Sequence, residues 1–227
     1  MRQTSFRRAF VYASAILCIS GCITDLVLIY LFGHQIPGYN QLTHTLSSLG
    51  VSTSPVAREV TLWSVILGTI FILFGFGFQE IFSTLGKQTR KAFWLFILYG
   101  LGEGVASGVF RIDLVNGELT NGAVLHEVFG GIGVVALLLL PLVMRKVFTQ
   151  YSFPLFFRYS GIVLAAGIIS TLLFSFRIQY FKGTFLYTYC GLWQRIFLVN
   201  FYIYFVVIAV MMIQEVNRHR QIRNNSK

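Results

Sequence analysis

Six long apolar stretches occupy most of the sequence and are separated by short polar connections. They cover residues 10–32, 60–82, 92–110, 123–144, 159–176 and 191–213. Each is close to the roughly 20 residues that an α-helix needs to cross the hydrocarbon core of a bilayer. None alternates with the period of two that membrane β-strands show. The pattern predicts an all-α integral membrane protein, folded as a six-helix bundle.

The composition agrees with this prediction. Of the 227 residues, 56% are hydrophobic and only 11% are charged, which leaves too little polar surface to coat a water-soluble globule. In lipid the backbone must satisfy its own hydrogen bonds, and helices do this within a single segment. No long Pro-, Gly- or Ser-rich linker divides the chain, so residues 1–227 are expected to form a single transmembrane domain.

Basic residues alternate in density from one connection to the next. The N-terminus, the second and fourth connections and the C-terminal segment together hold 13 Lys and Arg residues, whereas the other connections hold 5. By the positive-inside rule, both termini are expected in the cytoplasm, with residues 214–227 as a basic cytoplasmic tail and the cell membrane as the location. The net charge of +10 therefore reflects topology, so we expect membrane lipids as partners and no nucleic acid.

The cysteines do not have the spacing of a metal or redox motif. Cys18 and Cys22 lie four residues apart in the first stretch, and Cys190 is distant from both. Cys22 ends a short Ile-Ser-Gly-Cys run that resembles a lipoprotein processing site. The apolar stretch continues to Phe32, however, and this length favours a retained first helix over a cleaved signal.

The first outer connection is unusually long for a link between two helices, covering residues 34–59. Asn40 is a favourable helix cap, and Leu42, Leu46 and Leu49 follow at spacings that place them on one helical face. Gly50 is a suitable end for such a helix. The pattern predicts a short amphipathic helix in the membrane interface.

The third stretch contains an ionisable residue among glycines. Glu103 lies among Gly100, Gly104 and Gly108. The four-residue spacing of these glycines allows a second helix to approach closely. A carboxyl group in a membrane span is costly unless it is protonated, paired or hydrated. Glu103 is therefore either a neutral group that joins helices or a functional group, and Asp25 in the first span presents the same choice.

Most other polar residues with useful chemistry fall on the predicted outer side. The candidates for catalysis are His44, Ser47, Ser48, Asp113 and His126, and the candidates for ligand binding are Glu103, Arg111, Asp113, His126 and Arg195. His44, Asp113 and His126 also have the ligand chemistry for a metal such as zinc, although no paired His spacing supports a metal site. We expect no cofactor, because the sequence has neither a His pair suited to haem nor a Gly-rich phosphate loop.

An ordered set of short motifs resembles a known membrane family. The motifs are Leu46-Ser47-Ser48-Leu49-Gly50, Gly108-Val109-Phe110 with Asp113, His126 at a helix start, and Gly191-Leu192-Trp193-Gln194-Arg195. They resemble the prokaryotic family catalogued as domain of unknown function 998 over nearly the whole chain. The resemblance implies a six-helix integral membrane protein and implies no particular reaction.

Two positions depart from the pattern of that family. Its members often have Pro at the position of Arg111 and Glu at the position of Gln194. An unpaired guanidinium below the lipid headgroups is costly, and Gln194 cannot neutralise Arg195. We therefore expect Glu103, Asp113 or Glu127 to contact Arg195.

Three classes of function remain open from the sequence. The first is an outer polar pocket that binds a lipid headgroup or small molecule, with Arg111 and Arg195 holding an anion. The second is a membrane-embedded lipid hydrolase or transferase, metal-dependent or not, built around His44, Ser47 or Ser48, Asp113 and His126. The third is a small transporter that uses Glu103 or Asp25, although no inverted repeat supports it. Whether the protein is an enzyme is left undecided.

Overall fold

The computed structural model describes residues 2–225 and is an all-α membrane bundle. Within that range six helical spans are long and apolar enough to cross a membrane, as the hydropathy pattern predicts. Five are single helices, and the third span is built from three consecutive segments. The single helices are α1 (Arg2–His34), α2 (Ala57–Phe82), α5 (Asn121–Val147), α6 (Pro154–Ser175) and α8 (Cys190–Asn225).

The third span changes its helical geometry partway along. It begins as α3 (Lys87–Tyr99), continues as the π-helix η3 (Gly100–Ala106) and ends as α4 (Ser107–Val109). Short 3₁₀ segments η1 (Ser47–Gly50), η2 (Ser83–Leu85) and η4 (Gln179–Phe181), together with α7 (Phe185–Thr188), lie in the connections. π-Helical turns are rare in proteins, and those that occur are often found at functional sites. The segment η3 therefore marks this span for closer inspection.

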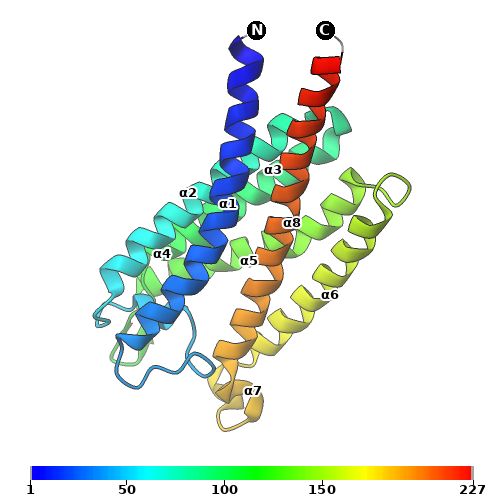
Figure 1. Ribbon diagram of the computed structural model, residues 1–227. Coiled ribbons are helices and arrows are strands. Elements are labelled where there is room, and N and C mark those ends of the chain that lie inside the picture. Colours follow the sequence, from blue (N-terminus) through cyan, green and yellow to red (C-terminus); the bar gives the residue numbers. More distant parts are fainter. Residues whose placement is uncertain (1, 226–227) are drawn as a thin grey trace.

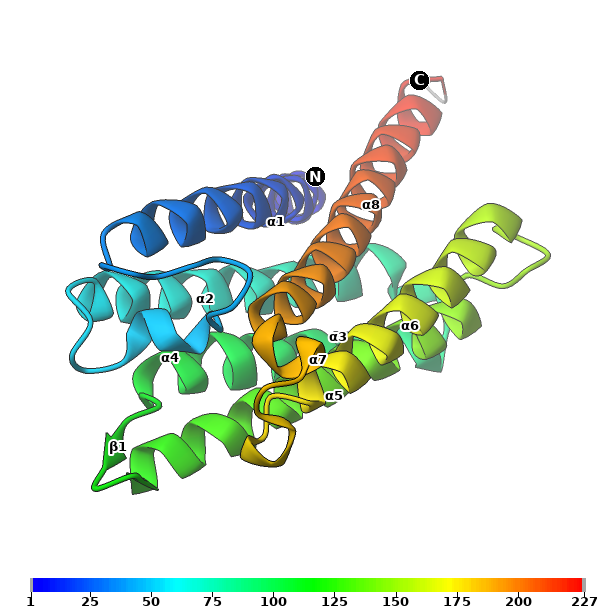
Figure 2. The ribbon, with the colours of Figure 1, turned by 90° about the horizontal axis from the view of Figure 1, so that it is seen from below.

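Both chain termini lie at the same end of the bundle, where α1 and α8 project beyond the other helices (Figure 1). We call the opposite end, which carries α7 and the first connection (residues 35–56), the distal end. The third span packs between α2 and α5, and α8 packs against α1 and α6 (Figure 2). The predicted basic tail coincides with the last turns of α8, and residues 226 and 227 lie outside the described range.

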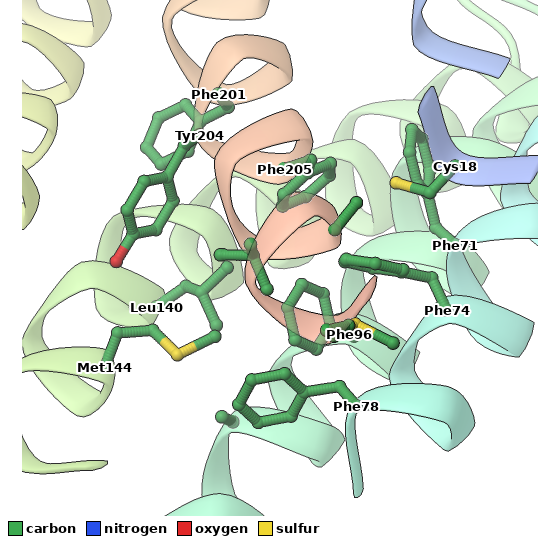
Figure 3. Close-up of a cluster of buried hydrophobic side chains, with 14 of the residues drawn as sticks. Cys18, Phe71, Phe74, Phe78, Phe96, Leu140, Met144, Phe201, Tyr204 and Phe205 are labelled. Atoms are coloured by element: carbon green, nitrogen blue, oxygen red, sulfur yellow. The ribbon is translucent and has the colours of Figure 1, made fainter. Parts of the chain in front are cut away.

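Aromatic side chains fill the centre of the bundle. Phe71, Phe74 and Phe78 of α2 meet Phe96 of α3 and Phe205 of α8, and all five are at most 2% exposed (Figure 3). The rings of Phe74 and Phe96 meet edge to face with centroids 5.1 Å apart, a favoured geometry for aromatic pairs. The phenylalanines of α2 therefore form a packed core as well as lipid-facing surface.

Glycines set the spacing on both sides of the third span. A Cβ atom at Gly68 of α2 would lie 2.5 Å from the carbonyl oxygen of Gly100. On the other side, a Cβ at Gly102 would lie 2.6 Å from the carbonyl oxygen of Phe129 in α5. Backbone atoms cannot move aside as the end of a side chain can, so these positions require glycine. The close helix approach predicted from the glycine spacing is confirmed, with α2 as one of the two neighbours.

The first connection is less helical than the sequence predicts. Asn40 does cap a turn, because its Oδ1 accepts a hydrogen bond from the Leu42 amide at 2.8 Å. Regular helix is nevertheless confined to η1, and Leu49 within it is 2% exposed. The predicted amphipathic helix from Asn40 is wrong in its extent, because the chain is held by tertiary contacts instead of by its own helical hydrogen bonds.

A two-stranded hairpin follows the third span, and the helical prediction does not include it. Its strands are β1 (Leu114–Val115) and β2 (Glu118–Leu119). Asn116 and Gly117 join them with φ of 54° and 83°, the left-handed conformations of a type I′ turn. The hairpin lies at the distal end beside the start of α5 (Figure 2).

Candidate functional site

A cavity of about 120 Å³ lies at the distal end of the bundle. The helices α1, α2, α5 and α8, the π-helix η3 and the first connection all contribute to its wall. Its polar lining includes Asp25, Ser47, Glu103, Ser107, Arg111 and His126. The cavity therefore gathers polar groups from segments that are far apart in the sequence, as the prediction of an outer polar site requires.

His126 is held in one orientation by the end of the third span. Its Nδ1 lies 2.8 Å from the carbonyl oxygens of both Ser107 and Phe110. Carbonyl oxygens only accept hydrogen bonds, so Nδ1 carries a proton. In the neutral ring Nε2 is then an acceptor, and the hydroxyl of Ser47 lies 3.0 Å from it. Two predicted site residues thus form one hydrogen-bonded pair.

Asp25 is a buried carboxylate with two neutral donors. It is 6% exposed and accepts hydrogen bonds from the Trp63 indole Nε1 and the Tyr202 hydroxyl, each at 2.7 Å. These bonds connect α1 to α2 and α8. Sequence reasoning did not identify Trp63 and Tyr202 as site residues, because nothing in their spacing shows that they face inward.

Glu103 lies on the π-helix η3, where the third span meets α5. A Cβ at Gly130 would lie 3.0 Å from its Oε2, and one at Gly133 would lie 2.8 Å from its own Cβ. Glu103 and Tyr99 line both the 120 Å³ cavity and a smaller neighbouring cavity of about 60 Å³. Across the described part of the chain, no side chain or backbone group is hydrogen-bonded to the Glu103 carboxylate.

Arg195 does not have the carboxylate partner that we expected. Its guanidinium donates five hydrogen bonds, to the Tyr39 hydroxyl, twice to Gln41 Oε1, and to the carbonyl oxygens of His44 and Gly191. Their lengths range from 2.6 to 3.1 Å. The expected contact with an acidic residue is wrong. Neutral oxygen atoms, most of them in the first connection, accept the hydrogen bonds of the Arg195 guanidinium instead.

Neighbouring residues of α8 attach the same segment. Gln194 Oε1 accepts a hydrogen bond from the Leu46 amide at 2.7 Å, and the Leu192 amide donates to the Leu42 carbonyl at 2.8 Å. The contact with Leu46 requires only an acceptor oxygen on residue 194. A Glu at this position, as in the family pattern described above, would also provide one. The start of α8 therefore holds the first connection over the cavity.

Asp113 attaches the other edge of the first connection. Its carboxylate accepts hydrogen bonds from the Ser52 amide at 2.8 Å and the Ser52 hydroxyl at 2.6 Å. Arg111 also donates to the Ser52 hydroxyl at 3.4 Å. The bonds from Ser52, followed by the charge of Arg111, lower the pKa of Asp113 below its usual range. Asp113 is thus an anchor for the connection and does not line the cavity.

The lowered pKa of Asp113 predicts a pH-dependent contribution to stability. The contribution is present above the pKa of the unfolded state, near 4, and is lost as the pH falls through the lower folded-state pKa. We expect Asp113→Asn to lower the Tm of the purified protein by a few degrees at pH 7 and to make no difference near pH 2. Thermal unfolding from pH 2 to 7 measures this. Glu118→Gln, on the exposed β2 strand, is the control, and a pH-independent deficit for Asp113→Asn would contradict the assignment.

The candidate metal ligands do not converge. His44 Nδ1 accepts from the Asn40 amide at 3.1 Å in the first connection, whereas His126 lines the cavity and Asp113 holds Ser52. No group of three His, Cys, Asp or Glu side chains able to hold a metal occurs among the described residues. Ser48 is also separate, since its hydroxyl donates to the Thr45 carbonyl at 2.6 Å. His44, Asp113 and His126 thus lie apart from one another, and of the catalytic candidates only Ser47 and His126 are within hydrogen-bonding distance of each other.

Glu127 and Arg177 form an ion pair beside the site. Arg177 donates to both carboxylate oxygens of Glu127, at 3.0 and 2.5 Å. The two-pronged geometry is the strongest form of this contact. Glu127 is thus occupied by Arg177 and does not neutralise Arg195.

Comparison with known proteins gives one family match. Residues 19–211 match the family described as "Protein of unknown function (DUF998)". The match covers the second to fifth spans completely, together with the later part of the first span and most of the last. No curated protein and no solved structure matches this chain.

Proposed function

The chain belongs to this DUF998 family of multi-pass membrane proteins, and on that premise we propose that its distal cavity binds the ammonium group of a small molecule or lipid headgroup. We also propose that the protein lies in the cell membrane with both termini in the cytoplasm, so that the cavity faces the exterior. The excess of basic residues on the side of the termini supports this orientation.

The observation that carries the proposal is the charge of the cavity wall. Asp25 and Glu103 contribute two carboxylates, and Asp25 is bonded only to neutral donors. His126 directs its Nδ1 proton to two backbone carbonyl oxygens, and Arg111 reaches Ser52 at the edge. A carboxylate removed from water is stabilised most by a positive partner, and none of the described side chains forms an ion pair with either acid.

The apolar part of the lining suits the same ligand. Trp63, Phe71, Tyr99 and Tyr202 all contribute to the cavity wall. The faces of aromatic rings attract cations, and such cages recognise alkylated ammonium groups. The anion site expected from Arg111 and Arg195 has less support, because Arg195 is held by the first connection and does not line the cavity.

Binding is tested by thermal shift of the detergent-solubilised protein with choline, ethanolamine and 3,3-dimethylbutanol, a neutral analogue of choline. We expect the two cations to raise the Tm and the alcohol to leave it unchanged. Glu103→Gln is expected to weaken cation binding at least tenfold, while Glu118→Gln on the exposed hairpin is expected to bind like the wild type. Equal shifts with choline and dimethylbutanol would overturn the proposal.

The two sources of an ammonium group are separated by reconstitution. In nanodiscs, native mass spectrometry is expected to retain phosphatidylethanolamine or phosphatidylcholine over phosphatidylglycerol if the ligand is a headgroup. If the ligand is a free small molecule, soluble choline or ethanolamine is expected to bind with the same affinity in all three lipids. Glu103→Gln is the matched variant in both arms, because it removes the charge and keeps the shape of the side chain.

A further inference from the structure

We infer that Ser47 is a nucleophile and His126 its general base, and that the pair hydrolyses a carboxylic ester admitted to the distal cavity. Both side chains line that cavity, and the Ser47 hydroxyl lies 3.0 Å from His126 Nε2. This separation is within the range at which a serine hydroxyl transfers its proton to an imidazole base. The inference concerns an activity and does not depend on the ammonium ligand.

The orientation of His126 is the second element of the argument. A base that activates serine needs an unprotonated nitrogen facing the hydroxyl and a protonated nitrogen facing an acceptor. The carbonyl oxygens of Ser107 and Phe110, both 2.8 Å from Nδ1, impose this tautomer. In catalytic triads an Asp takes this position, and here two backbone oxygens at the end of the third span replace it.

The surrounding helices keep the base in place. The two carbonyls belong to Ser107, which begins α4, and to Phe110, which follows its last residue. His126 is in the first turns of α5, which packs against η3 through Gly133. Ser47 begins η1, in the segment that α8 holds through Gln194 and Arg195. Ser47, His126 and the two carbonyl acceptors therefore lie on three segments, each held by contacts that do not involve Ser47.

The reaction balances with water as the only co-reactant. Ser47 Oγ forms a bond to the ester carbonyl carbon, and its proton passes to His126 Nε2. The bond from that carbon to the alcohol oxygen then breaks, and the proton on Nε2 passes to the departing oxygen. Water attacks the acyl-serine in the same way, giving its proton to Nε2 and releasing the carboxylic acid as Oγ regains a proton.

Reaction with an alkyl fluorophosphonate tests the nucleophile directly, because this probe phosphonylates activated serines with loss of fluoride. The purified full-length protein in detergent is incubated with the probe, and the site is located by peptide mass spectrometry. We expect modification at Ser47, with none in Ser47→Ala. Ser48→Ala is the matched control, since Ser48 donates to the Thr45 carbonyl, and it is expected to react like the wild type.

The base is tested by the rate of modification. His126→Gln is expected to slow the modification at least 100-fold, the usual contribution of a general base. The absence of a Ser47 adduct in folded wild type, or an unchanged rate in His126→Gln, would overturn the inference.

A cysteine variant keeps the test decisive if Ser47→Ala does not fold. Ser47→Cys retains a nucleophile of similar size, and its alkylation by iodoacetamide is expected to be faster than that of Ser48→Cys and to depend on His126. Choline binding to Ser47→Cys reports on the proposed function separately. In the wild type, choline binding without a Ser47 adduct, or a Ser47 adduct without choline binding, therefore shows which of the two proposals has failed.

Discussion

Replacing Gly133 by alanine is expected to lower the Tm of the detergent-solubilised protein by about 2–12 °C. The added Cβ would lie 2.8 Å from the Cβ and 2.9 Å from the amide nitrogen of Glu103. One of these two atoms belongs to the backbone of η3, so relief requires α5 and the third span to separate. Overpacking of this kind costs about 1–3 kcal/mol.

The same helix supplies a matched control for this prediction. Gly131 lies two residues earlier in α5, and a Cβ there would meet nothing within 4 Å. Gly131→Ala is therefore expected to leave the Tm unchanged or to raise it slightly, because alanine favours helix more than glycine does. Differential scanning fluorimetry of both variants is the measurement. Equal Tm values for the two would contradict the close approach of α5 and η3.

Replacing Arg195 by methionine is expected to release the first connection from α8. The change removes five hydrogen bonds and leaves Gln41 Oε1 and the Tyr39 hydroxyl without their donor. Bonds to a charged donor are worth about 1.5–3 kcal/mol when lost, so the released segment is expected to open far more often. Limited chymotrypsin digestion is expected to cut residues 39–49 at least tenfold faster than in the wild type.

Arg195→Lys separates the role of geometry from that of charge. A lysine keeps the positive charge but cannot span the same acceptors, so we expect it to resemble the methionine variant. Arg58→Met is the control, because Arg58 is exposed at the start of α2. If chymotrypsin cut residues 39–49 of Arg195→Lys as slowly as those of the wild type, the positive charge would hold the first connection, and the five-bond arrangement would not be required.

The helical spans could be predicted from the sequence because hydropathy and length determine them. Their ends could not, since α1 begins at Arg2 and α8 continues to Asn225, well beyond the apolar stretches. Helical hydrogen bonds continue into the polar flanks, where hydropathy gives no signal. The hairpin at Asn116 and Gly117 has a recognisable turn signal, but its two-residue strands are too short for a pattern of alternation.

The site was predictable as a set of residue types and not as a set of contacts. Ser47, Glu103 and His126 were named from their chemistry and predicted side of the membrane, and all three line the cavity. Arg195 was paired wrongly, because an arginine fork can be satisfied by carbonyl, amide and hydroxyl oxygens that no sequence pattern identifies. The inward direction of Trp63 and Tyr202 depends on how the helices rotate against one another, which only packing determines.

The attachment of the first connection to α8 also constrains how the protein is made. Gln194 binds the amide of Leu46 across 148 residues of sequence. A ribosome adds about 5–20 residues per second, so the nascent chain holds residues 39–49 for about 7–30 seconds before their anchor is synthesised. The first connection is therefore the last part of the distal end to take up its final position. A polypeptide that stopped short of residue 190 would lack the start of α8, and the first connection would not be held over the cavity.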